Sequence, residues 1–134
     1  MSPSRAPLPR PALVLLAAAA FQALLPPAGA QPPNTTYYAA IAFSSSTGRY
    51  GYTYGWLSED NARRASRAHC KADDARVVLV VGNGYAALAL GDDRSAYGYG
   101  YAETADEARR HALEECRKRT TNCYIAVCVH SWAG

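Results

Sequence analysis

Residues 38–43 (YAAIAF) and 50–56 (YGYTYGW) form a pattern that recurs at 85–90 (YAALAL) and 97–101 (YGYGY). Each copy is followed by an Ala- and Arg-rich stretch with helical spacing, and that stretch ends at a cysteine, Cys70 or Cys116. Self-similarity of this kind predicts an internal duplication. We place the first repeat at 37–83 and the second at 84–134.

Each repeat has the predicted element order strand, strand, helix, strand. Tyr, Thr, Val and Ile fill the predicted strands, since these residues suit the pleated surface of a sheet. Ser58 and Thr104 stand where helix N-caps are expected, and acidic residues occupy the turn that follows each of them. The predicted fold class is α+β: two tandem ββαβ repeats form a mainly antiparallel sheet that is packed by two helices and stabilised by disulfides.

The second strand of each repeat alternates tyrosine with glycine, so its two faces differ. Side chains two residues apart point to the same face of a strand. Because helices with alanine on their buried side are thin, we predict that the aromatic row packs beneath the helices as core. The alternative is an exposed aromatic platform for a glycan or a protein partner. This possible binding surface consists of Tyr50, Tyr52, Tyr54, Trp56, Tyr97, Tyr99 and Tyr101.

The other strands, such as 38–43 and 77–81, are apolar on both faces. Strands of this kind are normally covered on both sides, and two short helices cannot cover both faces of a six-stranded sheet. Either the sheet curls on itself or a second molecule covers the open face. We therefore expect another protein as a partner, or self-association.

Residues 1–30 have the pattern of a signal peptide. Arg5 and Arg10 precede an apolar stretch at 12–25 that is too short to span a bilayer, and residues 28–30 (AGA) fit a cleavage site. The protein is therefore expected to be secreted or periplasmic, with no stable membrane insertion after cleavage. The alternative is an uncleaved membrane anchor.

The exported chain is expected to have a flexible lead-in at 31–36 and a single duplicated domain at 37–134. This part of the chain contains 12 basic and 11 acidic residues. The near-neutral balance argues against nucleic acid as a partner.

All four cysteines lie in this domain, and an oxidising compartment favours disulfides. A Cys116–Cys123 disulfide would join the end of a helix to the start of the next strand across a short loop, which leaves Cys70 to pair with Cys128. The sequence has neither a C-x-x-C redox motif nor zinc-ligand spacing. We predict two structural disulfides, with metal or thiol chemistry as the alternative.

The duplicated Tyr-Ala-Ala-Ile-Ala and Tyr-Gly-Tyr stretches, the helices that end in cysteine and the apolar strands behind them resemble a family of small exported bacterial proteins (domain of unknown function 4189). The resemblance covers residues 37–130. It implies secretion and disulfide bonding, and it implies no activity and no catalytic residues. Members of the family often have a cysteine just before the third strand, where this chain has Arg76.

We assign no catalytic, cofactor-binding or metal-binding residues. Single histidines at helix edges, such as His69 and His111, are usually packed or solvated, and paired acids such as Asp92-Asp93 occupy turns. We predict a non-enzymatic protein that binds another macromolecule, as an inhibitor, immunity-type or effector-type module does. The first alternative is a cell-wall glycan-binding module that uses the tyrosine rows. The second is a small hydrolase in which one of these histidines joins an acid in a cleft.

Overall fold

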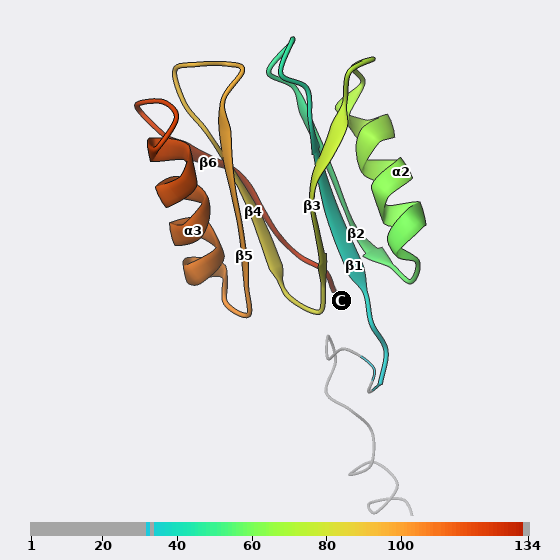
Figure 1. The fold of residues 1–134 in the computed structure, drawn as a ribbon. Helices are drawn as coiled ribbons and strands as arrows, with labels where there is room; N and C mark the ends of the chain where they lie inside the picture. Colours follow the sequence, from blue (N-terminus) through green and yellow to red (C-terminus); the bar gives the residue numbers. More distant parts are fainter. Residues whose placement is uncertain (1–31, 33, 133–134) are drawn as a thin grey trace, which may run out of the picture. The chain divides into compact units, whose positions relative to one another are not determined.

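The computed structural model describes residue 32 and residues 34–132, so the predicted signal peptide at 1–30 lies outside the described residues. The element order strand, strand, helix, strand occurs twice (Figure 1). This confirms the predicted α+β fold class with two ββαβ units. The first unit consists of β1 (Tyr38–Phe43), β2 (Tyr50–Trp56), α2 (Glu59–Cys70) and β3 (Arg76–Gly82). The second consists of β4 (Tyr85–Leu90), β5 (Tyr97–Ala102), α3 (Ala105–Arg117) and β6 (Tyr124–His130).

Both helices begin at the predicted N-caps. The side-chain oxygen of Ser58 accepts a hydrogen bond from the backbone N–H of Asn61 at 3.3 Å, and that of Thr104 accepts one from Glu107 at 3.3 Å. Each cap satisfies an N–H group that has no partner within the helix. Among the described residues, no helix is long and apolar enough to cross a membrane.

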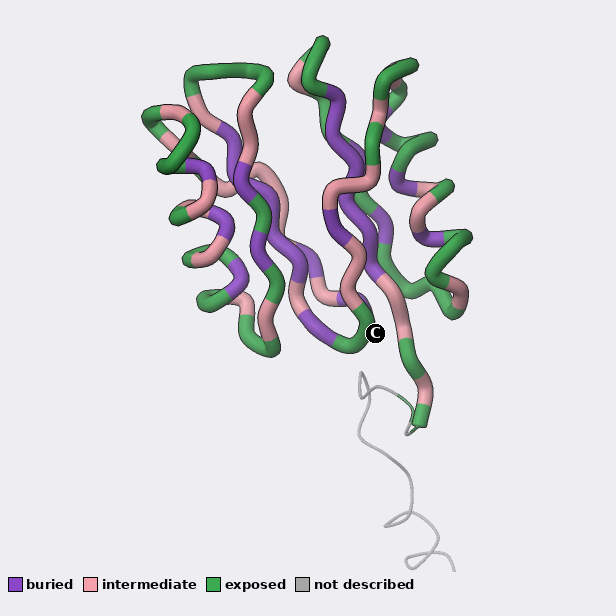
Figure 2. The backbone as a smooth tube through the Cα atoms, viewed as in Figure 1, coloured by how far each residue is buried: buried purple, intermediate pink, exposed green. Residues whose placement is uncertain are grey.

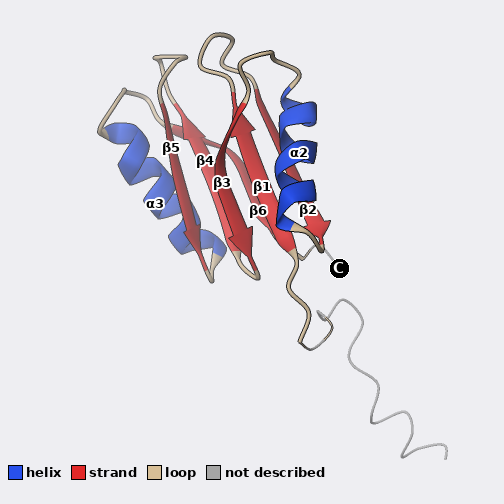
Figure 3. Ribbon diagram, turned by 45° about the vertical axis from the view of Figure 1, so that its right-hand side comes forward, coloured by secondary structure: helices blue, strands red, loops and turns tan. Residues whose placement is uncertain are grey.

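The strands form two antiparallel sheets of three strands rather than one continuous sheet of six. The strand order is β2-β1-β3 in the first sheet, here called sheet A, and β5-β4-β6 in the second, sheet B (Figure 3). The first strand of each unit is therefore central. The Tyr-Gly strands β2 and β5 each lie at an edge.

The two sheets pack face to face, and the helices cover their outer faces (Figure 1). Ile41 and Phe43 of sheet A lie in one buried cluster with Leu88 and Leu90 of sheet B. This arrangement buries the central strands almost along their whole length (Figure 2). The apolar strand faces for which the sequence indicated no cover thus pack against each other. They therefore give no reason to expect a second molecule.

The helices pack on the glycine faces of β2 and β5, so the prediction of a tyrosine core beneath the helices is wrong. A Cβ atom added to Gly51 would lie 2.5 Å from the carbonyl oxygen of Ser66, and one added to Gly100 would lie 2.5 Å from that of Ala108. Small residues on both elements let helix backbone approach strand backbone closely. The buried helix positions are Ala62, Ser66 and Cys70 in α2, and Ala108, Ala112 and Cys116 in α3.

Candidate functional site

A groove of about 420 Å³ follows the free edge of β2. Tyr50 and Tyr52 pair with Phe43 and Ile41 and so point toward the layer between the sheets. Because β2 is an edge strand, Tyr50, Tyr52 and Tyr54 stay 37–49% exposed. The hydroxyl of Tyr50 reaches sheet B, where it donates to the carbonyl of Ala126 at 3.2 Å. The groove, which we call the β2 groove, is lined by Tyr50, Gly51, Tyr52, Thr53, Tyr54, Trp56 and His69.

Trp56 does not point to the same face as the tyrosines of β2, so its predicted placement is wrong. Tyr38 pairs with Trp56 and Ala40 pairs with Thr53, which gives β2 one residue more than β1 over this interval. The extra residue is a β-bulge, and it reverses the face on which the following side chains lie. Gly55 occupies the bulge with a φ of 74°, a value that glycine adopts without strain.

The backbone N–H and C=O groups of β2 point alternately toward its neighbour β1 and toward the free edge, residue by residue. Ser44 N–H donates to the carbonyl of Arg49 at 2.9 Å, which starts the ladder to β1. Every second residue then faces β1, so the backbone groups of Tyr50 and Tyr52 and the N–H of Tyr54 face outward. Nδ1 of His69 lies 3.0 Å from the carbonyl oxygen of Tyr52, in agreement with this alternation.

A second groove, of about 470 Å³, follows the free edge of β5, and we call it the β5 groove. Two of its outward carbonyls have partners: Arg119 Nη1 donates to Tyr97 at 2.7 Å, and His111 Nδ1 lies 3.4 Å from Tyr101. A hydrogen bond from Lys118 lowers the pKa of Glu115, which keeps that carboxylate ionised. The groove therefore carries charge. Its lining is Tyr99, Gly100, Tyr101, His111, Glu115 and Arg119.

Tyr97 is the member of the β5 row that contributes to the core. Its ring lies 4.9 Å from the ring of Phe43 in sheet A, measured between centroids. The Arg119 guanidinium lies 5.8 Å from the centroid of the same ring. Tyr97 is therefore a core residue between the sheets, whereas Tyr99 and Tyr101 are exposed at the groove.

Sequence reasoning missed Glu115 and Arg119. Glu115 directly precedes the buried Cys116. This position is the signal that could have placed Glu115 at the border of the contact between helix and sheet. Arg119 lies beyond the end of α3, so the helical period does not predict the direction of its side chain.

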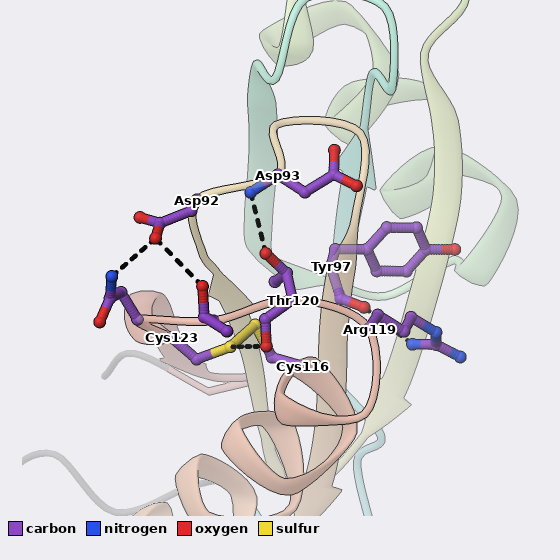
Figure 4. Close-up of a disulfide and its surroundings, with 9 residues drawn as sticks. Asp92, Asp93, Tyr97, Cys116, Arg119, Thr120 and Cys123 are labelled. Atoms are coloured by element: carbon purple, nitrogen blue, oxygen red, sulfur yellow. Dashed lines mark hydrogen bonds between the residues drawn. A yellow bond between two sulfur atoms is a disulfide. The ribbon is translucent and has the colours of Figure 1, made fainter.

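The predicted Cys116–Cys123 disulfide is present and joins the end of α3 to the residue before β6 (Figure 4). Asp92, in the loop between β4 and β5, braces the intervening turn. Its Oδ2 atom accepts hydrogen bonds from Thr121 Oγ1 at 3.1 Å and from Asn122 Nδ2 at 2.6 Å. The disulfide thus fixes the helix end that covers the glycine face of β5.

The predicted Cys70–Cys128 disulfide is wrong, since both thiols are free. Cys70 is buried where α2 packs on sheet A, and Cys128 packs against the cluster between α3 and sheet B. The two cysteines therefore belong to opposite outer layers, with both sheets between them. Burial raises the pKa of both thiols, which keeps them protonated at neutral pH and poor nucleophiles.

Replacement of both Cys116 and Cys123 by alanine should lower the free energy of unfolding by about 2.5 kcal/mol, because the disulfide closes a short loop and restricts the unfolded chain. This corresponds to a melting temperature roughly 10–20 °C lower for a domain of this size. Thermal unfolding with and without dithiothreitol measures the effect. The reductant should destabilise the wild-type protein and leave the double variant unchanged. A reductant effect on the double variant would show that Cys70 and Cys128 are bonded after all.

Within the described residues, the histidines and the acidic residues of the turns do not come together in one site. His69 and His111 contact backbone carbonyls, and Nδ1 of His130 lies 2.6 Å from the carbonyl oxygen of Trp132. Asp74 accepts a hydrogen bond from Ser44 Oγ at 2.5 Å, and such bonds lower its pKa. Within the described part of the chain, no three metal-ligating side chains are grouped as a metal site would require.

Residues 38–129 match the family described as Domain of unknown function (DUF4189). The match covers both ββαβ units except for His130 at the end of β6, and it includes both grooves. Comparison with curated proteins and with solved structures finds no match.

Proposed function

The chain belongs to the DUF4189 family, and we propose that it is an exported protein that binds another protein through the β2 groove and performs no chemistry of its own. A row of partly exposed tyrosines on an edge strand is the observation that supports this function. Tyrosine and tryptophan dominate binding energy in interfaces, because each buries a large area with few rotatable bonds. Inhibitor, immunity-type and effector-type modules all act in this way.

Export to the periplasm or the outside of the cell is supported by the signal-peptide pattern of residues 1–30. The Cys116–Cys123 disulfide is compatible with an oxidising compartment. We attribute the two ββαβ units to internal duplication, which the matching strand and helix patterns of 37–83 and 84–134 support.

A cell-wall glycan-binding module is the second candidate, and the β5 groove favours it. Tyr99 and Tyr101 lie there beside Glu115 and Arg119. Exposed aromatic rings next to charged hydrogen-bonding groups suit a ligand with both apolar faces and hydroxyls. The β2 groove has no Asp, Glu, Lys or Arg in its lining, which suits a protein surface better.

Capture of exported proteins on the immobilised mature chain, followed by mass spectrometry, tests the proposal. We expect a stoichiometric protein partner whose affinity falls by at least about 30-fold when Tyr52 and Tyr54 are both changed to serine, since aromatic hot spots contribute about 2 kcal/mol or more. The matched control changes Tyr99 and Tyr101 to serine and should bind as the wild type does. Circular dichroism of both variants shows whether the fold is kept.

Two results would contradict the proposed function. One is the absence of any stoichiometric protein partner. The other is a partner lost equally with both double variants, because the binding would then not depend on the β2 groove. A peptidoglycan pull-down that fails only for the variant in Tyr99 and Tyr101 would support the glycan candidate instead.

A further inference from the structure

We propose that the β2 groove takes up an uncharged, extended segment of the partner, which adds to sheet A as a fourth strand beside β2. This mode of binding rests on the proposed function, since it concerns the same groove and the same class of partner. Strand addition obtains affinity from main-chain hydrogen bonds and specificity from alternate side chains. The structure provides both at this edge.

The outward backbone groups of β2 are available to an added strand. Tyr50 presents its N–H and C=O, and Tyr52 and Tyr54 present their N–H groups, to the free edge. Within residues 34–132, the side chain that contacts this outward row is that of His69, at the carbonyl of Tyr52. An edge with unpaired groups of this kind is a template for another strand.

In the described part of the chain, the edge of β5 is more strongly occupied than that of β2: side chains contact two of its outward carbonyls, against one on β2, where His69 contacts Tyr52. Arg119 and His111 occupy the outward carbonyls of Tyr97 and Tyr101. At the spacing that aligns Cys70 with Cys116, the positions of these two residues hold Asp73 and Ala65 in the first unit. Neither of those side chains can donate a hydrogen bond to a carbonyl at neutral pH. Among the described residues, the guanidinium that donates to an outward carbonyl of β5 therefore has no counterpart on β2, whereas the histidine contact has one in His69.

The lining of the β2 groove determines the character of the bound segment. It carries no Asp, Glu, Lys or Arg, whereas the β5 groove carries Glu115 and Arg119. A charged side chain that entered the β2 groove would lose water without gaining an ion pair. Every second residue of an added strand would contact the rings of Tyr50, Tyr52 and Tyr54, so apolar or aromatic residues fit these positions.

The β-bulge sets the length of the bound segment. Regular pairing along the free edge begins at Tyr50 and ends where Gly55 turns away, with its N–H bonded to the carbonyl of Ser131 at 2.8 Å. A bulge terminates pairing and twists the strand. The segment recognised by the outward groups is thus about five residues long, or roughly 17 Å when extended.

Selection of an unbiased library of displayed peptides on the mature protein, with titration of the enriched peptide, tests the inference. Tyr52→Pro removes the outward N–H at position 52 and leaves the ladder to β1 intact, because proline is tolerated where a strand N–H faces solvent. Tyr52→Ala removes the same ring and keeps the N–H. We expect the proline variant to bind the peptide about 10-fold more weakly than the alanine variant, the equivalent of one main-chain hydrogen bond.

The matched pair Tyr99→Pro and Tyr99→Ala should bind the peptide equally well. Amide hydrogen exchange on the unaltered protein gives an independent measurement, which stays decisive if a proline variant fails to fold. The N–H groups of Tyr52 and Tyr54 should exchange more slowly in the complex, and that of Tyr99 should not change.

Three results would overturn strand addition at β2: no enriched peptide, equal binding by Tyr52→Pro and Tyr52→Ala, or slowed exchange at Tyr99 instead of Tyr52. If a protein partner is captured as described above and these results occur, the partner binds the groove by another mode. If capture fails as well, the proposed function fails with the inference.

Discussion

Gly100→Val should lower the free energy of unfolding by about 4 kcal/mol, which is a large part of the stability of a small domain. A Cβ atom at position 100 would lie 2.5 Å from the carbonyl oxygen of Ala108, 2.6 Å from Cβ of His111 and 2.7 Å from the backbone nitrogen of Ala112. Two of these atoms belong to the backbone of α3 and cannot rotate away. The helix would have to move off the sheet, and the β5 groove would lose the side chains that α3 supplies.

Tyr99→Val is the matched control, because residue 99 is the neighbour in the same strand and points to the other face. Valine favours strands, so the control should lie within about 1 kcal/mol of the wild type. Urea denaturation followed by circular dichroism measures both variants. If Gly100→Val were as stable as the control, α3 would not lie on the glycine face, and the placement of both tyrosine rows would be wrong.

The orientation of the Tyr-Gly strands shows what the sequence could and could not predict. The two-residue period separates Tyr99 from Gly100 correctly, yet it does not say which face meets a helix. The deciding factor is the small size of both partners: Ala112 and Gly98 allow close backbone contact. The large side chains, such as Phe43, then fill the layer between the sheets.

The division into two sheets could not be predicted from the sequence either. A strand pattern shows that a face is buried, but it does not show which part of the protein covers that face. The apolar faces of 38–43 and 77–81 were predicted to need cover, and the cover is the other half of the chain. The disulfide at Cys116 could be predicted since its partner lies across a short loop, whereas the pairing of Cys70 required knowledge of which layer it occupies.

The candidate site was predicted in part. The tyrosines of β2 were named from their spacing, and they line a groove. Trp56 was assigned to the wrong face because the bulge at Gly55 breaks the period that the assignment assumes. The contact between His69 and the carbonyl of Tyr52 depends on how closely α2 approaches β2, a distance that no sequence period encodes.

Ile41→Ala and Leu88→Ala should each lower the free energy of unfolding by about 3 kcal/mol, since both side chains are fully buried in the layer between the sheets. Because both belong to one buried cluster, the double variant should differ from the sum of the single effects by at least about 0.5 kcal/mol. Leu57→Ala, at a site 68% exposed, is the control and should change stability by less than about 0.5 kcal/mol.

Chemical denaturation of the four variants tests whether the sheets face each other. Strictly additive losses from Ile41 and Leu88 would mean that the two residues do not share a core, as in a single open sheet with one exposed face. Tyr52 pairs with Ile41 and stands on the same face. The inter-sheet layer therefore also positions the tyrosine row of β2, and a variant that loosens this layer should weaken partner binding even though it alters no residue of the groove.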